Sequence, residues 1–209
     1  MFLRRIIEWI NSLEAGHHFR KQASFFVKIS GVFILIASFV LGIVFLVVAL
    51  MFTRTSSVGA QAFVIIGTVI GLVIIGIVGT TLTMLFWNRA KKIVSAGEES
   101  HLIFGPIAGI VIRLSGEAAF IGFIGGGLLC LVCSIFGAAA FGWLALISLV
   151  FAFLLPLIAV VSLQFSYLIS EYASLIGDIA TNIKKIETAL STDATAAPTS
   201  ETVASEKDL

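Results

Sequence analysis

Four long apolar stretches, separated by short polar segments, dominate the sequence. They run over about 29–52, 62–87, 118–138 and 143–163. A bilayer core is crossed by about 20 helical residues, so each stretch is long enough to span a membrane. The pattern predicts an all-α integral membrane protein, a bundle of four transmembrane helices within a membrane domain over residues 22–190.

The composition supports the same class. Hydrophobic residues make up 59% of the 209-residue chain and charged residues 12%, and the mean hydropathy is +1.12. A soluble domain carries about 45–50% apolar and about 25% charged residues. We therefore expect the lipid bilayer to be the main partner of this surface, and the net charge of +1 gives no indication of nucleic-acid binding.

The N-terminal segment, residues 1–21, is predicted to be an amphipathic helix on the membrane surface followed by a basic link. Apolar side chains recur at helical spacing at Phe2, Leu3, Ile6, Ile7, Ile10 and Leu13. Arg4 and Arg5 occupy the other side, and Trp9 suits the headgroup region. The first apolar stretch is longer than the roughly 7–15 residues of a signal-peptide core, so we expect an uncleaved signal anchor.

The C-terminal extension, residues 164–190, continues the helical pattern beyond the fourth span. Its apolar stripe comprises Leu168, Tyr172, Leu175, Ile176, Ile179, Ile183, Ile186 and Leu190. Such a face must be covered by lipid, by the protein's own loops or by a partner. Glu171, Asp178 and Glu187 argue mildly against an anionic membrane surface. Residues 191–209 are rich in Ser, Thr, Ala and Glu, a composition that predicts disorder.

The distribution of Lys and Arg predicts the orientation. Cations gather in the N-terminal segment, in the segment between the second and third spans, and in the C-terminal extension, whereas the two opposite loops offer only Arg54. Short loops rich in Lys and Arg stay in the cytoplasm. We therefore expect both termini to be cytoplasmic, in a multi-pass protein of a plasma membrane, such as a bacterial inner membrane.

Two shorter features interrupt this scheme. Residues 102–112 are apolar but too short to cross, and Gly105-Pro106 is expected to break a long helix there. We therefore predict a separate interfacial or re-entrant element over these residues. A turn of a few residues near Ala140 to Gly142 is predicted to join the third and fourth spans.

An internal repeat is indicated by two similar segments. Lys28-Ile29-Ser30-Gly31 reappears as Arg113-Leu114-Ser115-Gly116, each at the start of a span. The same spacing aligns Gly42 with Gly127 and lays the second span over the fourth. Chance similarity of apolar helices is the alternative. A true duplication would give two hairpins that enter from the same side, related by a pseudo-twofold axis along the membrane normal.

Glycines mark candidate faces for helix packing or oligomer formation. The candidates in the second and third spans are Gly67, Gly71, Gly76, Gly79, Gly122 and Gly126. Small residues at such spacing let helix backbones approach closely in lipid. Ordinary packing within one monomer is the simpler interpretation, and a pore or an oligomer interface is the functional one.

Arg113 and Glu117 are one helical turn apart at the start of the third span. A carboxylate in a membrane helix is a candidate functional site, able to relay protons or bind a cation. The favoured interpretation is an interfacial ion pair, with Arg113 reaching toward the headgroups.

The remaining candidate ligands indicate no cofactor or metal. Cys130 and Cys133 share a face of an apolar helix without further ligands nearby in sequence, so we expect them to pack as small hydrophobic residues. His17, His18 and His101 lie in loops without the carboxylate or thiolate company of a zinc site.

These features favour a non-catalytic membrane scaffold or accessory subunit, acting on a membrane protein partner or as a homo-oligomer. A small oligomeric transporter or channel is the alternative, and an intramembrane enzyme is a remote one. A transporter requires polar groups that converge at mid-membrane. The candidates are Ser38, Thr68, Thr80, Thr81, Thr83, Ser134, Ser148, Ser162 and Gln164.

Overall fold

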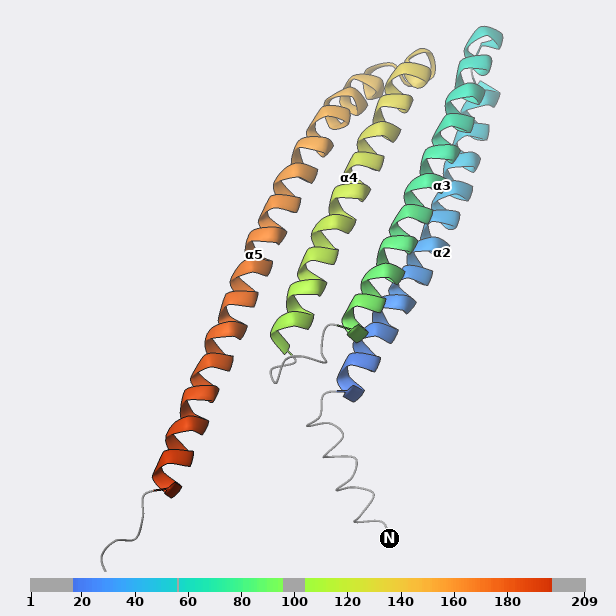
Figure 1. Ribbon diagram of the computed structural model, residues 1–209. Coiled ribbons are helices and arrows are strands. Elements are labelled where there is room, and N and C mark those ends of the chain that lie inside the picture. Colours follow the sequence, from blue (N-terminus) through green and yellow to red (C-terminus); the bar gives the residue numbers. More distant parts are fainter. Residues whose placement is uncertain (1–16, 56, 96–103, 197–209) are drawn as a thin grey trace, which may run out of the picture.

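The computed structural model describes residues 17–55, 57–95 and 104–196, which contain four consecutive helices. They are α2 (His17–Thr55), α3 (Val58–Ser95), α4 (Phe104–Phe141) and α5 (Trp143–Ala196) (Figure 1). All four are long and apolar enough to cross a membrane, the pattern of a multi-pass membrane protein. This confirms the predicted all-helical class and the four candidate spans. The predicted interfacial helix, His101 and residues 197–209 lie outside the described residues.

The helices form two antiparallel hairpins, α2–α3 and α4–α5, which point in the same direction (Figure 1). The start of α2, the end of α3, the start of α4 and the end of α5 lie at one end of the molecule, here called the terminal end. The connections from α2 to α3 and from α4 to α5 lie at the other end, called the turn end. Both hairpins therefore present their turns on the same side.

The four helices pack as an open row. Helix α3 contacts α2 and α4, and α4 contacts α5, which leaves α2 and α5 at the two edges. The apolar core follows α3, where Val64, Ile75 and Ile93 are buried. A bundle of four transmembrane helices was predicted, and the described residues form four helices suited to crossing a membrane. Lipid tails are as apolar as the side chains, so the outer faces of such helices need no cover from protein. A row of helices is sufficient in such a medium.

Gly142 makes the turn between α4 and α5. Its φ is +53°, the left-handed conformation in which a side chain is strained. Its amide donates to the carbonyl of Ala138, and its carbonyl accepts from the amide of Ala145. Gly142 thus ends α4 and starts α5 without further residues, in agreement with the short turn predicted there.

Several helix boundaries differ from those predicted. Helix α4 begins at Phe104 and passes through Pro106, so residues 104–112 are part of the third helix and form no separate element. Proline is tolerated in the first turn because amides there have no partner within the helix. Residues 17–21, predicted as a link, form the start of α2. Residues 191–196, predicted to be disordered, extend α5.

The starts of α3 and α5 correspond at the spacing of the predicted repeat, whereas the end of α3 and the packing within the hairpins do not. The spacing that relates Lys28 to Arg113 carries Val58, the first residue of α3, onto Trp143, the first residue of α5. The contacts within the hairpins differ, however. Gly31 lies against Phe86 and Trp87, but its counterpart Gly116 lies against Ser166, which is nearer to the turn end.

Candidate functional site

A network of polar side chains joins α3, α4 and α5 near the terminal end. Its centre is Glu117 of α4, which accepts hydrogen bonds from Nε of Arg89 at 3.0 Å and from Nη2 of the same side chain. The side chains of Arg89 and Glu117 are 18% and 15% exposed. A guanidinium that bonds both carboxylate oxygens is a strong and directional pair, so this contact fixes α3 against α4.

The partner of Glu117 is therefore Arg89, and not Arg113 as predicted. Along α4, Arg113 precedes Glu117 by one turn, and this order of charges is the less favourable one with respect to the helix dipole. Arg89 approaches from the neighbouring helix, where its fork can meet both oxygens of the carboxylate. The tertiary contact is thus preferred over the local one.

Helix α5 joins the network through Tyr167 and Ser170. The hydroxyl of Tyr167 donates to Oε1 of Glu117 at 2.9 Å. Nε of Arg113 donates to Oγ of Ser170 at 2.7 Å, and its guanidinium carbon lies 5.5 Å from the centre of the Tyr167 ring. Oγ of Ser170 donates in turn to the carbonyl of Gly109 at 3.1 Å. Each charged group of the network therefore has a partner on a neighbouring helix.

The sequence interpretation missed Arg89, Tyr167 and Ser170. Arg89 was counted as a loop cation because it follows Trp87, where the apolar stretch ends. In the structure α3 continues to Ser95, so Arg89 remains on a helix and beside α4. The sequence could have pointed to Arg89, because a carboxylate in a membrane helix such as Glu117 requires a cation nearby. Arg89 supplies that cation from the end of the preceding span.

The predicted glycine faces are partly used for packing within the chain. A Cβ built on Gly67 would lie 2.6 Å from Cβ of Phe136, and one on Gly79 would lie 2.6 Å from Cβ of Ser38. A Cβ on Gly71 would lie 2.5 Å from the ring edge of Phe45. Gly67 therefore permits close contact of α3 with α4, and Gly71 and Gly79 permit close contact of α3 with α2.

Gly76, Gly122 and Gly126 do not serve this purpose. A Cβ on Gly76 or Gly122 would meet nothing within 4 Å, and one on Gly126 would make an ordinary contact with Leu155. The tight positions in α4 are instead Gly116, against Ser166, Gly125, against Val78, and Gly127, against Pro156. Helical spacing identified the glycine-rich segments, but which member faces a neighbour depends on how the helices are rotated.

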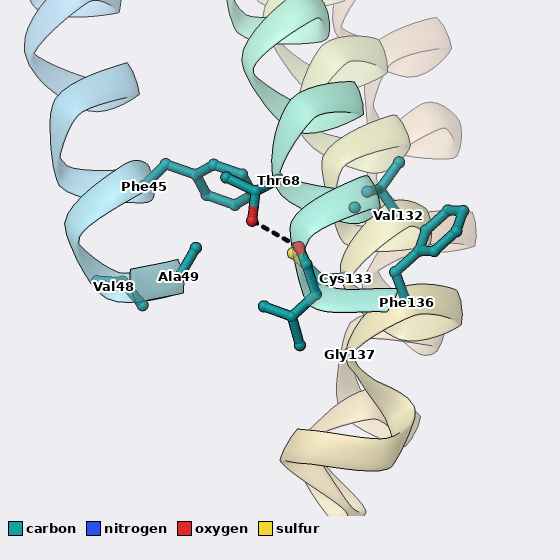
Figure 2. Close-up of a pocket in the computed structure, with 10 residues that line it drawn as sticks. Phe45, Val48, Ala49, Thr68, Val132, Cys133, Phe136 and Gly137 are labelled. Atoms are coloured by element: carbon teal, nitrogen blue, oxygen red, sulfur yellow. Dashed lines mark hydrogen bonds between the residues drawn. The ribbon is translucent and has the colours of Figure 1, made fainter. Parts of the chain in front are cut away.

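A small apolar crevice lies where α2, α3 and α4 meet, nearer to the turn end (Figure 2). It is lined by Phe45, Val48, Ala49, Val64, Gly67, Thr68, Val132, Cys133, Phe136 and Gly137. Oγ1 of Thr68 donates to the carbonyl of Val64 at 2.6 Å (Figure 2). Ligand sites combine an apolar lining with several convergent polar groups, and this lining offers one hydroxyl that is already bonded.

Three more of the predicted candidate hydroxyls also donate to backbone carbonyls. Ser38 donates to the carbonyl of Ile34, and Thr80 donates to those of Gly76 and Ile77. Thr83 donates to the carbonyl of Gly79 in its own helix and to that of Gly31 across the α2–α3 contact. These polar groups are satisfied by backbone.

The remaining predicted candidates are placed as follows. Cys130 and Cys133 are free thiols and half-buried on α4. Among the described residues, no three side chains of His, Cys, Asp or Glu lie close enough together to hold a metal ion. The apolar stripe of the C-terminal extension lies on α5, where Tyr172, Ile179 and Ile186 are 58–60% exposed.

Comparison with known proteins adds no functional assignment. No family model matches the chain, no curated protein is detectably similar in sequence, and no solved structure is detectably similar in fold.

Proposed function

We propose that the chain is a multi-pass membrane protein with cytoplasmic termini that acts as a non-catalytic scaffold or accessory subunit. Four helices suited to membrane crossing and the positive charge at the terminal end support this placement. With four spans, both termini lie on the same side. The function would be carried by surfaces for helix packing and by the extended α5.

The observation that carries this proposal is that four hydroxyls within the spans are bonded to backbone carbonyls. The hydroxyls of Ser38, Thr68, Thr80 and Thr83 donate to backbone carbonyls. Transport and intramembrane catalysis both require polar groups that converge on one path or pocket.

The network around Glu117 supports the same function. Its carboxylate accepts from Arg89 and Tyr167, so it joins three helices. Proton relays within membranes are built from chains of Asp, Glu or His side chains, and the side chains bonded to Glu117 are Arg89 and Tyr167. The cations of the network instead pair with Glu117 and Ser170, an arrangement suited to holding helices together.

The test is reconstitution of the purified protein in liposomes loaded with a pH-sensitive or potassium-sensitive dye. We expect flux equal to that of protein-free liposomes, together with specific co-purification of a membrane protein or a second copy from mild detergent. Ion flux above the protein-free control that disappears in the Glu117→Gln variant would favour the transporter alternative and reject the scaffold.

Cysteine accessibility tests the topology. A cysteine introduced at Ser57, in the α2–α3 turn, should react with a membrane-impermeant maleimide on intact cells. A cysteine at Ser95, at the end of α3, should react only after the membrane is opened. The opposite pattern would contradict cytoplasmic termini.

A further inference from the structure

A groove lies along the contact of α2 with α3, about midway along both helices, and is here called the α2–α3 groove. It is lined by residues between Leu35 and Leu46 of α2 and between Leu72 and Thr80 of α3. Its volume is about 510 Å³, and small-molecule sites occupy about 300–1,000 Å³. The groove is therefore large enough to hold a ligand, unlike the small crevice of Figure 2.

The lining of the α2–α3 groove suits an apolar chain. The hydroxyls of Ser38 and Thr80, which contribute to the lining, donate to carbonyls of their own helices. Gly76 also lines the groove, and a Cβ built there would meet nothing within 4 Å. The packing of this chain therefore does not require a glycine at this position. The space that Gly76 leaves is open to an occupant from outside the chain.

Two lysines continue the faces that form the groove toward the terminal end. Lys28 precedes Leu35 and Gly42 by seven and fourteen residues, so the three residues share a face of α2. On α3, Lys91 follows Thr80 by eleven residues, which again places both on one face. Lys28 and Lys91 are exposed. Both lysines therefore lie beyond the same end of the groove, one on each helix that forms it.

The two lysines lie at a similar depth. Gly31, three residues after Lys28, lies against the indole of Trp87, which is four residues before Lys91. The hairpin therefore brings the two cations to the same level, with an exposed indole beside them. Tryptophan is enriched at membrane–water interfaces, where the headgroups of a bilayer lie.

No carboxylate of the hairpin balances these lysines. Helices α2 and α3 contain no Asp or Glu, and Glu117 of the neighbouring α4 pairs with Arg89. The terminal end of the groove therefore carries a positive charge that the residues of α2 and α3 leave without an anion. Basic pockets between transmembrane helices on the cytoplasmic side are typical sites for anionic lipid headgroups.

We propose that the α2–α3 groove holds an acyl chain of one anionic phospholipid, whose headgroup phosphate lies between Lys28 and Lys91. This inference rests on the proposed function, because it requires α2 and α3 to cross a membrane with the terminal end in the cytoplasm. Lys28 is about 10 Å from Leu35 along the helix axis. A phosphate held by Lys28 at the membrane surface therefore places the acyl chain in the groove, within the hydrocarbon core. A helix of a partner would fill the groove but would leave both lysines without an anion.

Native mass spectrometry of the full-length protein in mild detergent tests the headgroup. The protein is titrated with dioleoyl phosphatidylglycerol or with dioleoyl phosphatidylcholine, which have the same chains. We expect the first phosphatidylglycerol to bind about tenfold more tightly, because two lysines face a headgroup with a net negative charge. Lys28→Gln with Lys91→Gln should remove this preference. Lys92→Gln with Lys185→Gln is the matched control, because it removes the same charge from exposed positions outside the groove.

A second pair of variants tests the groove. Gly76→Leu places a side chain in the space that the acyl chain would occupy, so it should weaken the binding of both lipids several-fold. Gly122→Leu is the control, because a Cβ on Gly122 also meets nothing within 4 Å and this residue does not line the groove. Thermal unfolding without added lipid should be the same for both glycine variants as for the unsubstituted protein. The lysine variants decide the headgroup even if Gly76→Leu fails to fold.

Four results would overturn the lipid site. They are equal binding of the two lipids, loss of the preference in the Lys92→Gln and Lys185→Gln control, unchanged binding to folded Gly76→Leu, and a co-purifying protein or second copy that is lost with Gly76→Leu but not with Gly122→Leu. The last result would assign the groove to a helix. Ion flux in liposomes would reject the scaffold function and leave the lipid site standing, so the two proposals fail separately.

Discussion

Glu117 is the residue on which the contact of three helices depends. Glu117→Gln removes the negative charge between Arg89 and Arg113 and weakens the bonds from Arg89 and Tyr167. Hydrogen bonds to a charged group are worth about 1.5–3 kcal/mol, and partial exposure reduces this. We expect Glu117→Gln to lower the free energy of unfolding in detergent by about 1–2 kcal/mol.

The control for this prediction is Glu171→Gln, which removes an exposed carboxylate from α5 and should leave the unfolding midpoint unchanged. A double-mutant cycle of Arg89→Gln and Glu117→Gln should show strong coupling, because the two side chains share one contact. Additive effects of the two substitutions would show that the pair contributes nothing to the packing of α3 on α4.

Gly142 is the second residue with a defined physical requirement. Its φ of +53° places it in the left-handed region, where an L side chain costs about 1–2 kcal/mol. We expect Gly142→Ala to reduce stability by about 1 kcal/mol, measured by thermal unfolding in detergent. Gly59→Ala is the control, because Gly59 is helical and a Cβ there meets nothing within 4 Å. An equal loss from both substitutions would contradict the conformational argument.

At the scale of the helix, Gly67 sets how closely α3 approaches α4. Its missing Cβ leaves room for Cβ of Phe136, which is fixed to the backbone of α4 and cannot turn aside. We expect Gly67→Ala to destabilise the protein by about 1–3 kcal/mol through overpacking. The neighbour of Gly71 is a ring edge, which can rotate, so Gly71→Ala should cost less.

Gly76→Ala is the matched control for this helix contact. Gly76 lies on the same helix, and a Cβ there would meet nothing within 4 Å. Because alanine is a better helix former than glycine, the substitution should be neutral or slightly stabilising. Thermal unfolding of Gly67→Ala and Gly76→Ala side by side tests the assignment, and the reverse order of stability would refute it.

The existence of the four helices could be predicted from hydrophobic length, but their ends could not. Residues 88–95 and 104–112 continue α3 and α4 although they are polar or contain Pro106. Hydropathy reports where a helix would leave lipid, whereas backbone hydrogen bonds and contacts with a neighbour decide where it ends. The polar network lies near these helix ends. The sequence therefore predicted Glu117 and Arg113 as site residues but not their partners on α3 and α5.

The partner of Glu117 illustrates why the rest of the site was missed. The residue type showed that the carboxylate needs a cation, and both Arg89 and Arg113 are within reach in sequence. Which arginine pairs with Glu117 depends on how α3 is rotated about its own axis relative to α4. The sequence pattern of one helix does not determine that rotation. The rotation likewise decides that Gly125 and Gly127, and not Gly122, contact neighbouring side chains.

At the scale of the whole molecule, two hairpins meet along the α3–α4 contact. Each hairpin has extensive contacts of its own, and the predicted repeat is matched by the starts of α3 and α5. The Arg89–Glu117 pair is an ion pair across the α3–α4 contact. If helices insert independently and then associate through packing and polar contacts, the hairpins should assemble without a covalent link.

The last prediction follows from this division. A chain cut between Ser95 and Phe104, with both halves expressed together and only one half tagged, should yield a complex of the two halves in mild detergent. Glu117→Gln in the second half should weaken recovery of the first half, because Arg89 then loses its carboxylate. Glu171→Gln in the same half should leave recovery unchanged. Full recovery with Glu117→Gln would mean that glycine contacts such as Gly67 with Phe136 hold the hairpins together without the ion pair.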